Sequence, residues 1–217
     1  LGSGAASAIA AGFPVYDAFA APLQYALKPV KLDDGVWMVP GAQEAITFAN
    51  GGAIANCAIL STDAGAVIID TGPSFAYGKA LANLANELTG KPVVRVYLTH
   101  FHPDHVFGNQ AFDAKVLATT EGGIDGLKSL GDAFADSMYR SAGDWMRGTE
   151  VLLPSTIITG EPEDFGNRTL RPLRMKGHTA SDLVLFDELS GMLFAGDLVF
   201  LDRAPTTPHA DLESWKI

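Results

Sequence analysis

Histidine is concentrated in one short stretch of this 217-residue chain, "HFHPDH" at positions 100–105. Three of the five histidines fall there beside one aspartate, giving the set His100, His102, His105 and Asp104. Imidazoles packed this closely repel one another when protonated, whereas neutral imidazoles can each donate a lone pair to a shared divalent cation. We therefore interpret the stretch as a metal site, because surface or core-packing histidines would give no reason for the clustering.

The residues around this stretch predict how the side chains converge. The run "VVRVYLTH" (93–100) is apolar almost throughout, which is typical of a strand buried on both faces. Residues i and i+2 of a strand point to the same side, so His100 and His102 can present their rings to one point. Pro103 then favours a turn that brings the next two residues back over the strand end.

Two distant segments supply further candidate ligands. "MKGHTASD" (175–182) places His178 in a loop, and "LFAGDLVF" (193–200) places Asp197 in apolar surroundings, where a carboxylate needs a partner charge. The expected ligands are His100, His102 and His178 for one ion, and Asp104 and His105 for a second, with Asp197 as the bridge. Nitrogen and oxygen donors without a thiolate favour zinc, as one or two ions, with manganese or iron possible.

Composition limits the class of protein. The length allows one sizeable core, and 47% apolar with 18% charged residues is an ordinary globular composition. The net charge of -10, from 15 basic and 25 acidic residues, disfavours nucleic acid and anionic membranes as partners. A small-molecule substrate is the partner expected, and the oligomeric state stays open. The single cysteine, Cys57, is expected to be a buried hydrophobe, because it lies in a strand-like run and has no disulfide partner.

The first twenty residues resemble the end of an export signal. Residues 1–16 carry no charge, and "AFA" at 18–20 has the small-x-small spacing that a signal peptidase accepts. We therefore expect residues 1–30 to be an export-signal remnant with a linker, and the protein to be periplasmic or otherwise exported. A cloning remnant or an Ala/Gly-rich tail is the alternative. The apolar run is too short and too broken to span a membrane.

The remaining pattern predicts the order of elements. Four short runs predict antiparallel strands: 35–40, 45–50, 55–62 and 66–70. Ser74 can cap a helix that Gly90 ends, with apolar residues at helical spacing on one face: Tyr77, Leu81, Leu84 and Leu88. After the strand at 93–100 come a strand at 114–120, a broken helical region at 121–147, and strands at 155–159, 168–175, 182–187 and 191–200. Strands flanking a helical middle predict an α/β sandwich of two sheets with helices outside.

At the level of spaced motifs, the chain resembles the metallo-β-lactamase superfamily over residues 32–203. "HFHPDH", "GHT" and "AGD" are similar to the metal-ligand pattern of that superfamily, and "GVWMVPG", "NCAILSTDAGAVIIDTGPS" and "DHVFGNQAF" to its surrounding segments. The resemblance implies a four-layer αββα sandwich over residues 31–217, with metals at one edge of the paired sheets. It also implies that Asp70 orients a ligand histidine, although an ordinary turn-initiating aspartate is the alternative. The stretches "THFHPDHVFGNQAF" and "AGDLVFLDRAPTTPHADLESW", together with the export-like start, also resemble the exported zinc metallohydrolases of quinoprotein oxidation systems.

One departure from the family pattern concerns the last expected ligand. The resemblance implies a histidine some forty residues beyond the bridging aspartate, but this sequence ends at Ile217, 20 residues after Asp197 (217 - 197). His209 follows Asp197 by only 12 positions (209 - 197), and "HADLESWKI" is typical of a helix start, with His209 near its cap or at a pocket rim. The expectation is a domain truncated at its C-terminus, in which the second ion is lost or weakly held.

The expected activity is that of a metal-dependent hydrolase. A zinc ion lowers the pKa of its bound water to about 7, which supplies hydroxide for attack on an ester, thioester, lactone or amide carbonyl. Asp104 would orient that nucleophile or shuttle its proton as well as bind metal, which makes it the candidate catalytic residue. Two other functions stay open: an exported metal-binding accessory protein without turnover, and a redox dimetal enzyme.

Overall fold

The computed structural model of the chain describes residues 23–216. The predicted export signal therefore lies outside the described residues, and its assignment stays a prediction. No helix within the described residues is both long and apolar enough to cross a bilayer.

Seven strands form the larger sheet, in the order in which they occur in the sequence. They are β1 (Val30–Asp33), β2 (Val36–Val39), β3 (Cys57–Ser61), β4 (Ala66–Ile69), β5 (Val93–Tyr97), β6 (Leu117–Thr119) and β7 (Thr156–Ile157). The first four pair antiparallel and the last four pair parallel, so β4 belongs to both halves. Three of the four strands predicted for the antiparallel meander are thus confirmed as β2, β3 and β4 in the first half of this sheet.

A smaller antiparallel sheet has the strand order β11-β10-β9-β8. Its strands are β8 (Glu163–Asp164), β9 (Thr169–Met175), β10 (Asp182–Asp187) and β11 (Leu193–Phe194). The helices are α1 (Phe75–Thr89), α2 (Pro103–Val106) and α3 (Glu121–Ala142), with 3-10 turns at Asn109–Ala111, Gly143–Met146 and Gly196–Leu198.

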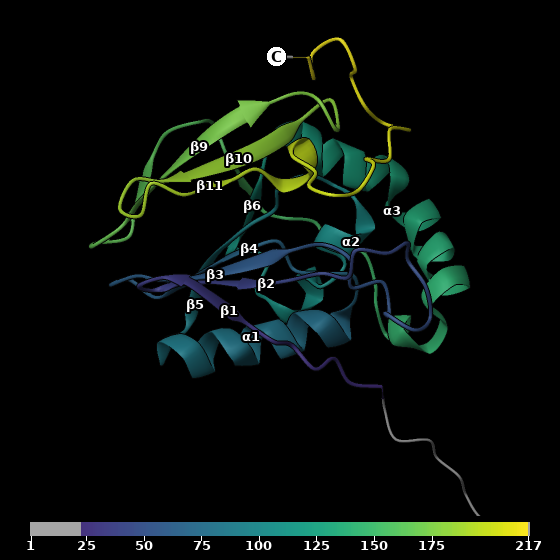
Figure 1. Cartoon of the computed structure of the whole chain (residues 1–217), viewed down its shortest axis with the longest axis horizontal. Helices are drawn as coiled ribbons and strands as arrows, with labels where there is room; N and C mark the ends of the chain where they lie inside the picture. The colour runs from purple at the N-terminus through teal and green to yellow at the C-terminus, as the bar shows by residue number, and fades with distance from the viewer. Residues whose placement is uncertain (1–22, 217) are drawn as a thin grey trace, which may run out of the picture.

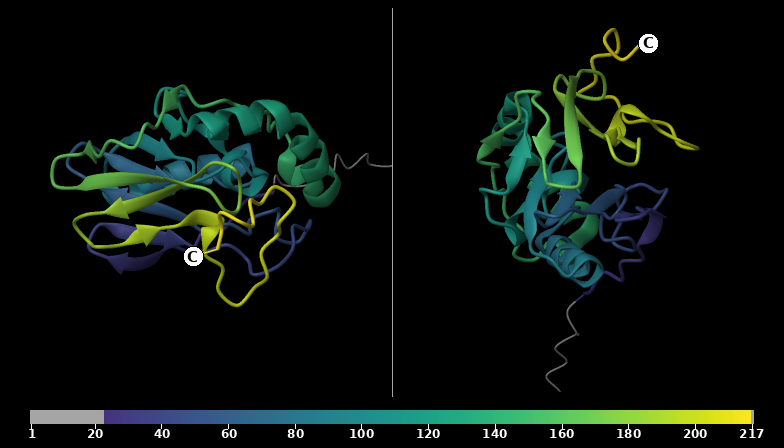
Figure 2. Two further views of the ribbon diagram at one scale, coloured as in Figure 1. Left: turned by 90° about the horizontal axis from the view of Figure 1, so that it is seen from above. Right: turned by 90° about the vertical axis from the view of Figure 1, so that its left-hand side faces the viewer.

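The two sheets stack, helix α1 covers the outer face of the larger one, and α3 lies beside α2 at the end of the sheets (Figures 1 and 2). One apolar cluster fills the space between helices and sheet and includes Ile68 and Val96. A second cluster fills the space between the sheets and includes Tyr97 and Leu185. The predicted α/β sandwich is therefore confirmed, and the adjacent residues Val96 and Tyr97 bury β5 on both faces, as its apolar sequence predicts.

Helix α1 shows why the sequence pattern identified it correctly. The Ser74 side chain accepts a hydrogen bond from the Tyr77 backbone N–H at 3.3 Å, and Gly90 ends the helix in the left-handed conformation with φ 67°. Its buried face includes Tyr77, Leu81 and Ala85, four residues apart along the helix.

One predicted strand is wrong. Residues 45–50 form a turn rather than a strand, because the Asn50 side chain binds the local backbone. Its Oδ1 accepts from the Thr47 and Gly52 N–H groups at 3.0 and 2.9 Å, and its Nδ2 donates to the Ala45 carbonyl at 2.8 Å. Such local side-chain bonds compete with strand pairing. Strand β1 was not predicted, and the strand expected at 191–200 is only two residues long before a 3-10 turn begins at Gly196.

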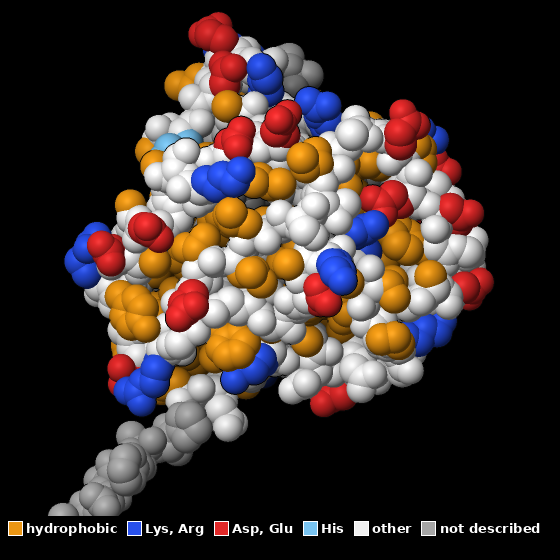
Figure 3. All heavy atoms as spheres, turned by 180° about the vertical axis from the view of Figure 1, so that it is seen from behind, with side chains coloured by type: hydrophobic (Ala, Val, Ile, Leu, Met, Phe, Trp, Pro, Cys, Tyr) orange, Lys and Arg blue, Asp and Glu red, His pale blue; other side chains and the backbone are white. Residues whose placement is uncertain are grey.

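The surface charges and the single cysteine can be compared with what the composition led us to expect. On the back face, shown in Figure 3, acidic and basic side chains of the described residues lie interspersed among apolar ones. Cys57 is buried in β3, as expected, and burial raises the pKa of its thiol to about 12. A thiol in this state is a packing residue and a poor nucleophile at neutral pH.

Candidate metal centre

The histidine-rich stretch follows β5, an interior strand of the larger sheet, and lies at the carboxyl end of that strand. β5 ends at Tyr97, so His100 and His102 lie beyond the strand, which corrects the prediction that they share a strand face. His102 has an extended backbone and precedes the short helix α2, where Pro103 occupies the first turn. The helical turn, rather than strand alternation, brings His105 to the same side as His100.

This loop is fixed to the segment that follows β4. The Thr71 N–H donates to the His105 carbonyl at 2.7 Å, and the Gly108 N–H donates to the Gly72 carbonyl at 2.9 Å. The Thr71 hydroxyl also donates to Asn109 Oδ1 at 2.9 Å. A Cβ on Gly108 would lie 2.0 Å from the Thr71 carbonyl oxygen, so this approach requires glycine.

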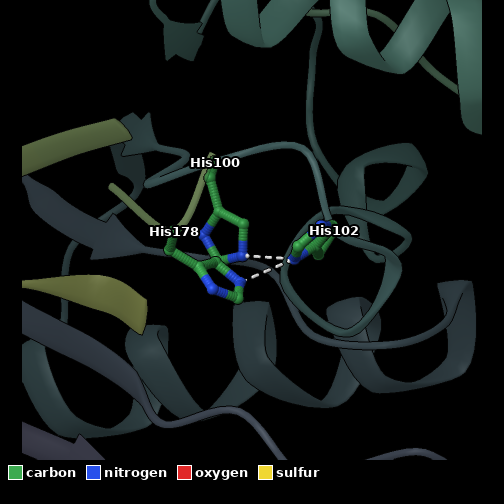
Figure 4. Close-up of side chains that lie close together, drawn as sticks. All are labelled: His100, His102 and His178. Carbon is green, nitrogen blue, oxygen red and sulfur yellow. Dashed lines mark hydrogen bonds between the residues drawn. The ribbon is translucent and has the colours of Figure 1, made fainter. Parts of the chain in front are cut away.

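Three imidazoles meet at the centre of the site. His102 Nδ1 lies 3.1 Å from His100 Nε2 and 2.8 Å from His178 Nε2, and Figure 4 shows the three rings pointing toward one another. All three side chains are buried, and the three nitrogens satisfy the spacing of a shared metal ion. The structure thus brings His178 from the β9–β10 loop to the pair that the sequence predicted, 76 residues away from His102.

A second triplet lies beside the first and shares His100. It consists of His100, His105 and Asp197, whose ligand atoms lie within 4.8 Å of one another. Asp197 Oδ1 is 3.2 Å from His105 Nε2, and its Oδ2 is 3.4 Å from His178 Nε2. The carboxylate therefore lies between the two triplets, where the sequence reasoning placed a bridge. Asp104 Oδ2 lies 3.5 Å from His105 Nε2, next to the second triplet.

Asp70 sets which ring nitrogens face the site. Its Oδ2 accepts from the Thr99 hydroxyl and contacts His105 Nδ1, each at 2.8 Å, while its Oδ1 accepts from the Thr99 N–H at 2.8 Å. Because the Thr99 hydroxyl gives its proton to Asp70, it accepts from His100 Nδ1 at 3.0 Å. Both His100 and His105 then keep a proton on Nδ1, which makes Nε2 the nitrogen of each ring that faces a metal. Asp70 thus makes the contacts of an orienting carboxylate and not of a simple turn residue.

The three converging imidazoles are neutral in the protein without metal. Burial lowers the pKa of His100 well below its usual range, with help from the neighbouring His105, His102 and His178. Burial also lowers the pKa of His102 to about 3 and that of His178 to about 4. A metal ion needs the unprotonated form, so these side chains are prepared to bind one.

The pKa of His105 is shifted in the opposite direction to that of the other three histidines. Burial alone would lower its pKa, but the charges of Asp197, Asp104 and Asp70 raise it well above the usual range. Burial likewise opposes ionisation of Asp197, yet the charge on His105 lowers the pKa of this carboxyl to about 2. Burial raises the pKa of Asp104. A metal ion at the second triplet would take the place of the His105 proton as the positive partner of these carboxylates.

Two local devices hold the distant ligands. In the loop that carries His178, Asp182 accepts from the Thr179 N–H and from the Thr179 hydroxyl, the latter at 2.8 Å. Gly196, which precedes Asp197, has φ 53°, and a Cβ there would lie 2.8 Å from the Thr99 side chain. Glycine is therefore needed to bring Asp197 close to the end of β5.

The donor set fits a divalent cation. His105 Nε2 is buried and makes no hydrogen bond of acceptable geometry among the described residues, although it faces carboxylate oxygens. Three neutral imidazoles, a fourth imidazole with an orphaned nitrogen, and two carboxylates are ligands that zinc accepts, and manganese or iron also bind such sets. Five of the six predicted ligands lie in the two triplets and Asp104 lies beside the second, while ion binding itself stays a prediction.

A two-sheet α/β sandwich with histidines and aspartates gathered at one sheet edge defines a class of metal-site proteins. The sequence profile of the metallo-beta-lactamase superfamily matches residues 50–216. The chain belongs to the metallo-beta-lactamase superfamily.

Individual relatives place the chain within that family only broadly. It is 26% identical over 190 residues to the human and to the bovine acyl-coenzyme A thioesterase MBLAC2, in matches that cover 78% of this chain and 65% of each relative. A stretch of 54 residues is 33% identical to a linear primary-alkylsulfatase from Pseudomonas sp. (strain ATCC 19151), covering 25% of this chain and 10% of that protein. The chain therefore spans slightly less than two thirds of the length of the thioesterases.

Solved structures confirm the fold. A metallo-beta-lactamase from Pontibacter korlensis superimposes with a TM-score of 0.67 at 23% identity, covering 87% of this chain and 81% of that one. The metallo-beta-lactamase IND-7 superimposes with a TM-score of 0.65 at 20% identity, with coverage of 88% and 81%. At these identities the likeness establishes architecture and leaves the substrate open.

The site contains residues whose roles sequence reasoning missed. The Thr99 hydroxyl hydrogen-bonds both Asp70 and His100, and Asp182 hydrogen-bonds Thr179 in the loop that carries His178. Neither a threonine nor a single aspartate stands out in a sequence. His209 was expected at a helix start or at a pocket rim. The described residues that follow it form turns rather than a helix, and its Nδ1 lies 2.9 Å from His102 Nε2. No local pattern predicts that contact, because 107 residues separate the two histidines.

Proposed function

We propose that this protein is a metal-dependent hydrolase, with zinc as its ion, that acts on a small molecule containing a carbonyl ester, thioester, lactone or amide. The observation that carries the proposal is the convergence of His100 Nε2, His102 Nδ1 and His178 Nε2 on one point, with all three imidazoles neutral. Membership in the metallo-beta-lactamase superfamily supports it.

Each group has a defined task in this proposal. The first triplet would hold one ion, and His105 with Asp197 would hold or share a second. A divalent ion bound there would act as a Lewis acid toward a carbonyl oxygen and make a water molecule nucleophilic near neutral pH. Asp104 is buried with a raised pKa beside His105, so its carboxyl can hold or pass a proton next to that position.

The relatives suggest where to look for the substrate. The thioesterases act on acyl-coenzyme A according to their name, and a thioester is more easily hydrolysed than an amide. We therefore propose thioesters as the first class to assay, with β-lactams, lactones and simple esters as the comparison.

Metal content and turnover should be measured on the same preparation. The protein is stripped with a chelator, reloaded with zinc, manganese or iron, and assayed with acetyl- and long-chain acyl-coenzyme A, nitrocefin, an acyl lactone and p-nitrophenyl acetate. The proposal predicts turnover that appears with zinc and disappears in His178→Ala. Bound metal without turnover on every substrate would favour the accessory role, and activity restricted to an iron-loaded, coloured protein would favour redox chemistry.

We also propose, from residues 1–20 alone, that the protein works outside the cytoplasm. Because this segment resembles only the end of a signal, the test places a basic N-terminal start before residue 1, expresses the chain in a bacterium with two membranes and fractionates the cells. Recovery of a shortened protein in the periplasm supports export, and an unprocessed cytoplasmic protein contradicts it.

A further inference from the structure

Each of the four histidines of the site has one ring nitrogen that faces away from its centre, and these four nitrogens differ in their hydrogen bonding. His100 Nδ1 meets Thr99, His105 Nδ1 meets Asp70, and His178 Nδ1 is buried with no hydrogen-bond partner in residues 23–216. His102 differs in directing its Nδ1 inward, so its Nε2 faces outward. The partner of that Nε2 is His209 Nδ1 at 2.9 Å.

We propose that His209 is a positioning residue that fixes His102 as a metal ligand. For His102 Nδ1 to offer a lone pair to the ion, its proton must lie on Nε2, and His209 Nδ1 accepts that proton in a hydrogen bond. The pair therefore selects the tautomer of His102 in the way that Asp70 and Thr99 select those of His105 and His100. The inference rests on the proposed metal centre but concerns a residue outside both triplets.

Two aromatic rings pack against the imidazole of His209. Its ring centroid lies 5.8 Å from that of Phe101 and 5.7 Å from that of Phe134, both at steep interplanar angles. These rings also contact His102, at 5.2 Å from Phe101 and 5.9 Å from Phe134. The two aromatic side chains thus pack against both imidazoles and cover part of a hydrogen bond that is part-buried.

The chain segment around His209 is fixed to the other side of the site. The Asp211 N–H donates to the Gly177 carbonyl at 2.9 Å, directly before His178. The Trp215 indole N–H donates to the Leu198 carbonyl at 3.0 Å, directly after Asp197, and its ring centroid lies 5.5 Å from that of His178. Residues 207–216 therefore contact the three parts of the chain that carry His102, His178 and Asp197, and hydrogen bonds hold the backbone from which His209 reaches His102.

The test compares His209→Ala with His209→Asn, because the asparagine Oδ1 can replace the imidazole Nδ1 as an acceptor. The dissociation constant of the tightest zinc ion is measured by chelator competition. Loss of an outer-shell partner of a ligand histidine weakens metal binding by about 10- to 100-fold, and we expect that loss in the alanine variant. The asparagine variant should recover most of it. Leu212→Ala, an exposed change in the same segment, is the matched control and should bind zinc like wild type.

A spectroscopic readout separates positioning from general stability. Imidazole ¹⁵N spectra of the zinc-loaded protein should show His102 protonated on Nε2 in wild type and in His209→Asn, with that proton exchanging much faster in His209→Ala. The inference is overturned if His209→Ala binds zinc within about twofold of wild type, or if His102 binds the ion through Nε2. A wild type that binds no metal would refute the proposed function instead.

Discussion

Replacement of Thr99 by valine should weaken metal binding although Thr99 touches no metal-facing atom. The hydroxyl donates to Asp70 Oδ2 at 2.8 Å and contacts His100 Nδ1 at 3.0 Å, and the side chain is buried. Valine keeps the shape of threonine but breaks both contacts. His100 Nδ1 then has no acceptor, and the preference for a free Nε2 lone pair is lost.

The magnitude follows from the two lost contacts. A hydrogen bond to a charged group contributes about 1.5 to 3 kcal/mol, and a buried unsatisfied donor costs about 1 to 3 kcal/mol. We expect the free energy of unfolding of the metal-free protein to fall by about 3 kcal/mol or more. Zinc affinity should fall by about 10- to 100-fold, as for other outer-shell partners of ligand histidines.

Two variants control for burial and shape. Thr99→Ser keeps the hydroxyl and should bind zinc nearly as tightly as wild type. Thr119→Val makes the same change at a buried threonine whose hydroxyl donates only to the Leu98 carbonyl at 2.9 Å, so it should lower stability and leave zinc affinity unchanged. Chelator competition and urea unfolding measure both quantities. Wild-type zinc affinity in a folded Thr99→Val protein would refute the claim that Asp70, through the Thr99 hydroxyl, holds the His100 proton on Nδ1.

Further predictions concern the helix contact, the proton-carrying carboxyl and pH. Gly78→Ala should lower the free energy of unfolding, measured in urea, by about 1 to 3 kcal/mol, because its Cβ would lie 2.3 Å from the Gly108 carbonyl oxygen. Alanine usually favours a helix over glycine, so a more stable variant would contradict this reasoning. Asp104→Asn should lower kcat by about 100-fold or more while zinc affinity at the three-histidine triplet stays within about threefold, and an unchanged kcat would remove Asp104 from the chemistry. Zinc affinity at that triplet should change by less than about threefold between pH 7.5 and 6, because the pKa values of His102 and His178, about 3 and 4, keep protons from competing until the pH falls much lower. Three histidines with the ordinary pKa of about 6.5 would instead lose about 50-fold over the same range, and a loss of that size in a chelator titration would contradict the lowered pKa values.

Much of the site could be predicted because its information is local. The clustering in "HFHPDH" needs no knowledge of the fold, a loop histidine can supply a third neutral nitrogen, and a carboxylate in an apolar run needs a partner charge. The structure brings His178 and Asp197 to the cluster. The apolar runs and the capped helix α1 similarly follow from side-chain periodicity.

What could not be predicted depends on long-range contacts or on competition between local ones. The sequence of residues 45–50 has strand-forming side chains, and only the bonds made by Asn50 decide for a turn. The sharing of Asp70 between Thr99 and His105 depends on how the 70–72 segment meets the histidine loop. The contact of His209 with His102 depends on where residues 207–216 dock, which no short pattern reports.

Anomalous diffraction from crystals of the zinc-loaded protein, recorded on both sides of the zinc absorption edge, tests the central claim most directly. The account predicts an ion bound by His100 Nε2, His102 Nδ1 and His178 Nε2, each at about 2.0 to 2.1 Å. A folded protein that shows no anomalous peak among these three nitrogens, or that holds its zinc elsewhere on the surface, would contradict the account.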